Sequence, residues 1–156
     1  MRLSYAEIAA HLGLPGSRDD RLLTTAVTDS REACPGALFV CVPGSRVDGH
    51  DFAAAAVERG AGAVLAQRPL PPVGAPVLLV PDTVTALGRI AALWRSRTRA
   101  RVVGITGTAG KTTLKEVLAQ VLAVRGQTAR NALNHNNQIG MPRAMLATDG
   151  QEDFWV

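Results

Sequence analysis

The 156-residue sequence is poor in cysteine, in aromatic residues and in long apolar runs. Its two cysteines, Cys34 and Cys41, form neither a CxxC pair nor a cysteine-rich framework. This excludes a disulfide-stapled miniprotein and a zinc ribbon, and it favours the reducing cytoplasm. No apolar run approaches the roughly 18 residues that a membrane-spanning helix needs, and the first residues lack the apolar core of a secretory signal. We therefore expect a cytoplasmic protein with no membrane as partner.

Lysine is scarce as well, because Lys111 and Lys115 are the only lysines among 17 basic residues. The formal net charge is +4, yet aromatic residues make up only 4% of the chain. Proteins that bind RNA or single-stranded DNA usually stack the bases on aromatic side chains. We therefore expect no nucleic acid as partner. The basic balance indicates either a solvated surface or attraction of small polyanions such as nucleotides.

A hydrophobic fraction of 47% with 19% charged residues is enough for a packed core. The length fits one domain or two small ones, and the residue pattern predicts two successive α/β units. In the first, residues 1–81, Ser4 and Glu7 form a capping box ahead of a helix. The expected helices of this unit cover residues 5–12 and 52–59, and its expected strands cover 22–28, 37–42, 63–66 and 77–80.

The second unit, residues 82–156, begins with a helix from Thr83 to about Arg97 that Asp82 caps. Pro142 is expected in the first turn of a later helix. The remaining expected elements are strands over 102–106 and 128–132, helices over 112–124 and 139–146, and a strand that begins at 153. Because this last strand has no continuation, we expect a truncated polypeptide.

A glycine-rich loop, Gly-Thr-Ala-Gly-Lys-Thr-Thr at 107–113, lies between a predicted strand and a predicted helix. Glycines let backbone amides turn toward a phosphate, and the helix start adds a favourable dipole. In such a loop Lys111 reaches the β- and γ-phosphates, and the Thr112 hydroxyl binds magnesium. Ile105 stands where the longer motif has its outermost glycine. The alternative, an ordinary turn of small residues, explains the lysine and threonines less well, so the sequence predicts a triphosphate site.

Two further polar clusters flank predicted buried elements. The first surrounds the strand at 37–42, with Asp-Ser-Arg at 29–31 before it and a run ending in Asp-Gly-His at 48–50 after it. These are either ordinary turns or a site where Ser30, Arg31 and Arg46 hold a uracil or diphosphate. The second contains Asn134, Asn136 and Asn137, which either cap the next helix or line a polar site.

These motifs together resemble a known family. Residues 106–112 are similar to the phosphate loop of the Mur ligases and folylpolyglutamate synthetases, which lack the outermost glycine. The Asp-Ser-Arg, Pro-Gly-x-Leu-Phe-Val and Asp-Gly-His-x-Phe runs resemble the UDP-binding domain shared by two Mur ligases. Lys115-Glu116 and the Asn-x-Asn-Asn-x-Ile-Gly-x-Pro run favour the member that adds D-alanyl-D-alanine. Leu133 departs from the family pattern, which has glycine there.

The resemblance implies an ATP-dependent amide ligase of peptidoglycan precursor synthesis. ATP with Mg²⁺ would phosphorylate a carboxylate of UDP-N-acetylmuramoyl-tripeptide, and the amine of D-Ala-D-Ala would attack the acyl phosphate. Residues 1–81 would be the UDP-substrate-binding domain, and 82–156 the first part of a central P-loop ATP-binding domain. The rest of that domain and the C-terminal domain would lie outside the chain. We therefore expect these residues alone to lack turnover, and the intact protein to be a monomer.

The resemblance also implies roles for individual residues. Lys111 and Thr112 would be catalytic, with Thr112 as the magnesium ligand. The expected ATP-binding residues are Gly107, Thr108, Ala109, Gly110, Lys111, Thr112 and Thr113. The expected UDP-substrate residues are Ser30, Arg31, Arg46, Asp48, Gly49 and His50, and those on the second-substrate or phosphate side are Asn134, Asn136 and Asn137.

Three alternatives remain open. The chain could belong to the ligase that adds the third amino acid of the peptide, or form a stand-alone nucleotide-binding module. His50 could cap the helix that follows it instead of touching a ligand. As neighbours on one helix, Lys115 and Glu116 are expected not to pair with each other.

Overall fold

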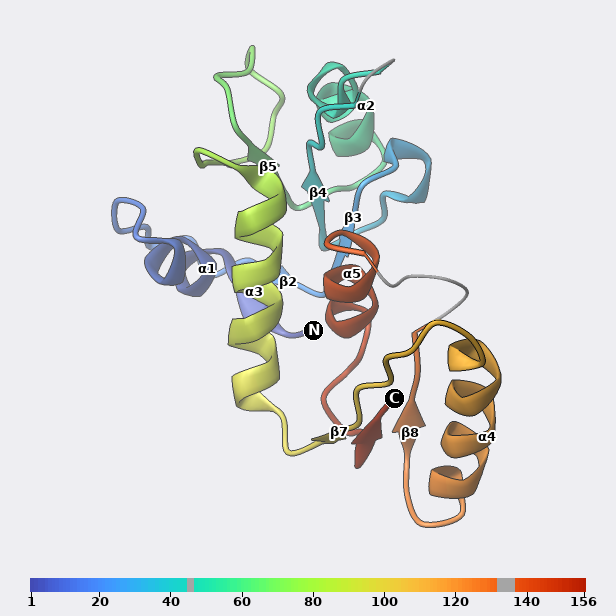
Figure 1. The fold of residues 1–156 in the computed structure, drawn as a ribbon. Helices are drawn as coiled ribbons and strands as arrows, with labels where there is room; N and C mark the ends of the chain where they lie inside the picture. The colour runs from blue at the N-terminus through green and yellow to red at the C-terminus, as the bar shows by residue number, and fades with distance from the viewer. Residues whose placement is uncertain (45–46, 132–136) are drawn as a thin grey trace.

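The computed structural model describes residues 1–44, 47–131 and 137–156. It contains two parallel sheets, one from each half of the chain (Figure 1). The first sheet has the order β3-β4-β5-β6, and the second has the order β7-β9-β8. The strands of the first are Thr25–Val27, Ala37–Val40, Ala63–Ala66 and Val77–Leu79, and those of the second are Arg101–Val102 (β7), Thr128–Ala129 (β8) and Phe154–Trp155 (β9). A short antiparallel pair, β1 (Leu3–Ser4) with β2 (Leu22–Leu23), precedes them.

The central strands β4 and β5 are buried along their whole length, and for β4 the continuous apolar run predicts this. The apolar run at 77–80 also predicts a buried strand, but β6 lies at the edge of the sheet and its Leu79 is 45% exposed. Successive side chains of a strand point to opposite faces. Leu38 and Val40 therefore join one core, while Phe39 and Cys41 join the other. The first core lies between the sheet and helices α1 (Tyr5–Leu12), α3 (Thr83–Arg97) and α5 (Gly140–Leu146); the second lies under α2 (Ala53–Glu58).

Two predicted helix starts are confirmed in atomic detail. The Glu7 amide donates to the Ser4 hydroxyl at 3.2 Å, and the Ser4 amide donates to the Glu7 carboxylate at 2.7 Å. At α3 the Asp82 carboxylate accepts from the Thr85 amide at 2.8 Å. The helix predicted over 52–59 is shorter, because a 3₁₀ turn, η2 (Gly49–Phe52), occupies its beginning.

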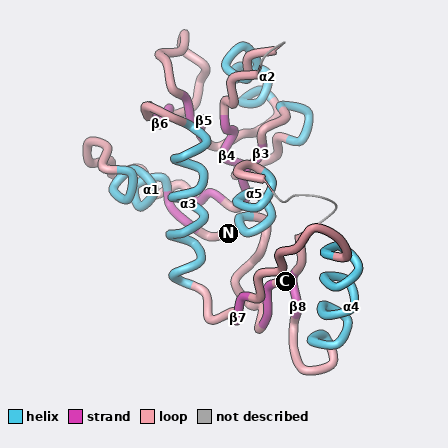
Figure 2. The backbone as a smooth tube through the Cα atoms, viewed as in Figure 1, coloured by secondary structure: helices cyan, strands magenta, loops and turns pink. Residues whose placement is uncertain are grey.

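The strand predicted over residues 102–106 is wrong in its length, since β7 contains only Arg101 and Val102. The Val103 amide still donates to the Trp155 carbonyl at 2.8 Å, but the partner strand β9 ends there. Without a ladder partner, residues 104–110 run as an exposed loop into α4 (Lys111–Ala123) (Figure 2). Pro142 lies in the first turn of α5, as predicted.

Helix α5 returns to the first sheet after the chain has passed through β7, α4 and β8. It packs against α3 and beside β3 (Figure 1). Leu146 at its end and Trp155 in β9 belong to the same core as Leu3 and Ile8. The two halves of the chain therefore share one core. Among the described helices none is both long enough and apolar enough to span a bilayer.

Candidate functional site

The glycine-rich loop connects β7 to the first turn of α4. Gly107 has φ +152° and Gly110 has φ +77°, the left-handed conformation that ends the loop and begins the helix. A Cβ atom at Gly110 would meet nothing within 4 Å. Glycine is therefore favoured there by backbone conformation and not by crowding.

The start of α4 presents backbone donors without acceptors. The amides of Lys111, Thr112 and Thr113 have no acceptor within the helix, and the described residues supply none from elsewhere. The side chains of Thr112 and Thr113 are exposed, and the Lys111 ammonium donates to the carbonyl of Gly107. Unpaired amides, a helix N-terminus and an ammonium group fit a bound phosphate. The Thr112 hydroxyl adds an oxygen of the kind that Mg²⁺ accepts beside phosphate oxygens.

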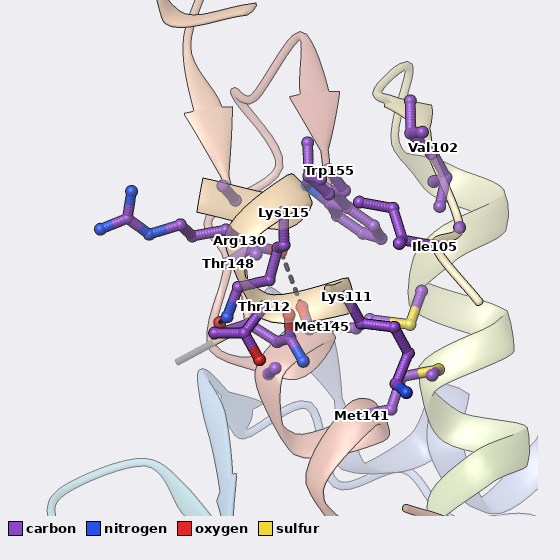
Figure 3. A pocket seen from close by; sticks show the side chains of 16 residues that line it. Val102, Ile105, Lys111, Thr112, Lys115, Arg130, Met141, Met145, Thr148 and Trp155 are labelled. Carbon is purple, nitrogen blue, oxygen red and sulfur yellow. Dashed lines mark hydrogen bonds between the residues drawn. The ribbon is translucent and has the colours of Figure 1, made fainter. Parts of the chain in front are cut away.

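A pocket of about 200 Å³ opens beside this helix start (Figure 3). It lies where β8 and β9 end, between the loop, α4 and α5, which is where parallel α/β sheets bind ligands. Its walls are largely apolar, with a few charged or hydroxyl-bearing side chains. The lining residues are Val102, Val103, Gly104, Ile105, Lys111, Thr112, Lys115, Ala129, Arg130, Asn131, Met141, Ala144, Met145, Thr148, Trp155 and Val156.

Lys115 lies one helical turn beyond Lys111 and is buried. Its ammonium donates to the Asn131 carbonyl at 2.8 Å, which ties α4 to the end of β8. It also lies 3.3 Å from the Glu116 carboxylate, and Glu116 in turn pairs with Arg130 at 3.0 Å. The expectation that Lys115 and Glu116 do not pair is therefore wrong. Both side chains are long enough for their charged ends to meet, although the two residues are neighbours on one helix. The i, i+4 spacing from Lys111 is a sequence signal for placing Lys115 beside the pocket.

Ser30 and Arg31 lie in a 3₁₀ turn, η1 (Ser30–Glu32), that follows β3. Asp29 organises this turn. Its carboxylate accepts from the Arg31 amide at 2.9 Å and pairs with the Arg31 guanidinium at 2.6 Å. The Arg31 side chain and backbone hydrogen bonds lower the pKa of Asp29 to about 2. The Arg31 side chain is 82% exposed, although its Nε and one terminal nitrogen donate to Asp29.

The Asp48-Gly49-His50 segment follows β4 and starts η2. His50 is buried, with Nδ1 2.5 Å from the Asp48 carboxylate and Nε2 accepting from the Gln67 amide at 3.1 Å. The His50 amide also donates to Asp48 at 3.0 Å, and these bonds lower the pKa of Asp48 to about 2. Both ring nitrogens of His50 thus have partners inside the protein. A Cβ atom on Gly49 would lie 2.7 Å from the Val42 amide nitrogen, so only glycine fits without a backbone shift.

The fold brings the first polar cluster to one edge of a sheet. The segments at 29–31 and 48–50 follow the carboxyl ends of the neighbouring parallel strands β3 and β4.

Four of the residues singled out in the sequence lie outside the described residues: Arg46, Leu133, Asn134 and Asn136. Asn137 lies just before α5, and its side-chain oxygen accepts from the amides of Ile139 at 3.1 Å and Gly140 at 2.7 Å.

Other predicted features concern metal binding and cysteine. Within the described ranges no group of three or more His, Cys, Asp or Glu side chains could hold a metal ion. Cys34 is exposed and Cys41 is buried. Burial raises the pKa of the Cys41 thiol to about 12, as expected for a small apolar core residue. The apolar character of cysteine predicts burial for Cys34 as well, and its exposed position shows that this prediction is wrong. Arg143 was not predicted by any motif, since its partners lie 111 and 115 positions away along the chain.

Curated relatives resemble most of this chain. It is 44% identical over 137 residues to UDP-N-acetylmuramoyl-tripeptide--D-alanyl-D-alanine ligase of Escherichia coli, covering 88% of this chain and 30% of that protein. It is 50% identical over 101 residues to UDP-N-acetylmuramoyl-L-alanyl-D-glutamate--2,6-diaminopimelate ligase of Geobacillus thermodenitrificans, covering 64% of this chain and 20% of that protein. The chain thus spans less than a third of the length of these relatives.

Solved structures share the fold. MurF from Acinetobacter baumannii superposes with a TM-score of 0.87 at 28% identity, over 100% of this chain and 35% of that chain. MurF ligase from Thermotoga maritima in complex with ADP gives 0.76 at 34% identity, over 85% of this chain and 31% of that chain. Residues 24–95 match the family described as Mur ligase family, catalytic domain. The chain therefore contains a Mur ligase family domain, and it spans about a third or less of the length of each of these members.

Proposed function

We propose that these residues are the amino-terminal part of an ATP-dependent ligase of peptidoglycan precursor synthesis. The enzyme joins D-Ala-D-Ala to UDP-N-acetylmuramoyl-tripeptide through an acyl phosphate, in the cytoplasm and as a monomer. One observation carries the proposal: unpaired amides, Lys111 and Thr112 converge beside a pocket in a chain 44% identical to a relative named for this reaction. By themselves these residues bind ligands but do not turn over.

On the nucleotide side, the residues provide charge and orientation. Bound MgATP would supply the phosphoryl group for the substrate carboxylate. The amides of residues 107–113 would hold the phosphates, Lys111 would donate to the β- and γ-phosphates, and Thr112 would hold the magnesium ion. Stabilisation of developing negative charge is the main protein contribution to such transfers. Lys115 supports this arrangement through its bond to Asn131.

On the UDP side, we assign direct and supporting roles separately. On η1, Arg31 is exposed and Ser30 is partly exposed. Both contact the UDP portion of the substrate, together with Arg46. Asp48, Gly49 and His50 shape the neighbouring loop, because their polar atoms or close contacts are already used within the protein. This division assigns residues 1–81 to UDP-substrate binding and 82–156 to ATP binding. Asn134, Asn136 and Asn137 belong to the phosphate side, where Asn137 fixes the start of α5.

A second candidate is the ligase that adds the third amino acid, since the Geobacillus relative is named for that reaction. The two candidates differ in the peptide that the UDP-sugar carries. The alternative enzyme accepts the muramoyl-dipeptide, whereas the proposed one accepts the tripeptide.

Thermal unfolding tests the proposal with four samples: no ligand, UDP-N-acetylmuramoyl-tripeptide, the corresponding dipeptide, and MgATP. A ligand at 100 times its dissociation constant adds about 2.7 kcal/mol to the free energy of unfolding, which raises the midpoint by roughly 5–10 °C for this length. We expect a larger shift with tripeptide than with dipeptide. A larger shift with dipeptide supports the alternative ligase, and a shift with MgATP alone supports a stand-alone nucleotide module. ADP release that depends on both tripeptide and D-Ala-D-Ala would contradict the absence of turnover.

A further inference from the structure

Helix α5 carries one arginine that reaches across to the first sheet. Arg143 donates from one terminal nitrogen to the Thr28 hydroxyl at 3.1 Å and from the other to the Glu32 carboxylate at 2.5 Å. Thr28 directly follows β3, and Glu32 is the last residue of η1. One guanidinium therefore holds both ends of the turn that carries Ser30 and Arg31.

This contact differs from an ordinary surface ion pair. The Arg143 side chain is only 23% exposed, and its Nε–H is buried without an acceptor among the described residues. In a solvent-exposed ion pair, the Nε–H of the arginine bonds to water. A buried N–H group without an acceptor is unfavourable. The guanidinium is nevertheless held at this place by two bonds of fixed geometry. Its position is therefore defined by the packing of α5 against β3.

The same short helix forms a wall of the phosphate-loop pocket. Met141, Ala144 and Met145 line the pocket together with Lys111 and Thr112 (Figure 3). The helix comprises only Gly140–Leu146, and the amide of its first residue donates to the Asn137 side chain. Arg143 on one side and the two methionines on the other are thus separated by a single helix diameter.

We propose that Arg143 is a positioning residue that couples the turn at 28–32 to the phosphate-loop pocket. A UDP-linked ligand that orders this turn also stabilises α5, because the turn and the helix share one guanidinium. The inference rests on the proposed function, since it takes the ligand of the turn to be UDP-linked. It predicts coupling between the two sites before any chemistry occurs.

Hydrogen–deuterium exchange of this chain tests the coupling, with UDP-N-acetylmuramoyl-tripeptide as ligand. In the unchanged chain we expect slower exchange at residues 25–33 and also at 140–148, by about tenfold or more at 100 times the dissociation constant. Arg143→Met keeps a long helix-compatible side chain but removes the donors. In this variant we expect protection at 25–33 only.

Two further variants complete the experiment. Glu32→Gln weakens the same contact from the other side, so it is also expected to lose the protection of α5, and it serves if Arg143→Met does not fold. Arg97→Met is the matched control. It removes a 2.5 Å pair with Glu7 that joins α3 to α1, away from the turn, and should keep both protected segments.

The outcomes separate this inference from the function on which it rests. Protection of α5 that persists in both Arg143→Met and Glu32→Gln would overturn the coupling. So would protection of the turn without protection of α5 in the unchanged chain. Absence of protection at both 25–33 and 48–52 would overturn the proposed function, and the coupling would fall with it.

Discussion

At the scale of single residues, two lysines one helical turn apart have different surroundings. Lys111 is partly exposed and donates to the loop carbonyl of Gly107, whereas Lys115 is buried and donates to the carbonyl of Asn131. Binding and stability therefore depend on different lysines. The less buried of the two side chains is the one that we propose to bind the nucleotide.

We predict that Lys111→Met weakens binding of a fluorescent ADP analogue by tenfold or more and leaves the unfolding midpoint unchanged. The loss of one charge-assisted hydrogen bond corresponds to about 1.5–3 kcal/mol. Lys115→Met, the matched variant, should instead lower the free energy of unfolding by about 1–3 kcal/mol, because the Asn131 carbonyl loses a buried donor. Equal effects of both variants on binding and on stability would contradict this division.

We predict that ionised Asp48 stabilises the fold and that this stabilisation is lost in acid. Its pKa is about 2 in the folded chain and 3.8 as the ordinary value, chiefly because the backbone and side chain of His50 donate to it. A carboxyl with a lowered folded-state pKa stabilises the fold above pH 3.8, and this contribution is lost as the pH falls toward 2. In urea titrations at pH 5 and pH 2.5, the difference between the unchanged chain and Asp48→Asn should shrink at the lower pH. A constant difference would show that ionisation of Asp48 is not the cause.

Residue-level prediction succeeded where a feature is local in sequence. The capping pair Ser4 and Glu7 is three positions apart, and so are Asp82 and the amide it caps. Arg143 and its partners could not be found this way, because their proximity depends on how α5 docks on β3. The roles of the phosphate-loop residues remain predictions, although the structure places the amides and Lys111 together.

At the scale of elements, apolar pattern predicted the strands that are buried on both faces. β4 reads as a continuous apolar run and is fully buried, but β6, read in the same way, lies at the sheet edge and is only partly buried. The same reasoning failed for residues 102–106, since strand length also depends on a partner strand, and β9 pairs with only the first part. Helix α3 was predicted with its observed bounds because its cap, its apolar stripe and its end are all local signals.

We predict that Asp82→Ala lowers the free energy of unfolding by about 1 kcal/mol, within a range of roughly 0.5–2. The variant leaves the Thr85 amide at the start of α3 without its side-chain acceptor. Asp82→Asn retains an oxygen acceptor and is the control, with a smaller expected loss. Denaturant unfolding of the three proteins measures the effect, and equal losses for alanine and asparagine would exclude the cap as its cause.

At the scale of the whole molecule, one helix leaves an apolar stripe uncovered. Leu114, Val117, Val121 and Val124 recur along α4 and are 54%, 52%, 60% and 86% exposed. Their spacing places them along one side of the helix. A contiguous exposed apolar surface favours association.

We predict that the 156-residue chain self-associates at high concentration and that Val121→Glu with Val124→Glu reduces this association. Both positions are exposed, so the unfolding midpoint should change little. Sedimentation velocity over a concentration series measures the mass. The surface change Glu58→Gln is the control, and unchanged association in the double variant would exclude the stripe as the contact.

The shared core also has a consequence for the order in which the chain folds during synthesis. Leu3 and Ile8 emerge from the ribosome well before Leu146 and Trp155, which pack in the same core. At about 5–20 residues per second, several seconds pass between the synthesis of β6 and that of α5. The face of the first sheet that α5 covers is exposed to solvent during this time. During that interval it is a natural substrate for chaperones, and slow translation beyond β6 would lengthen the exposure.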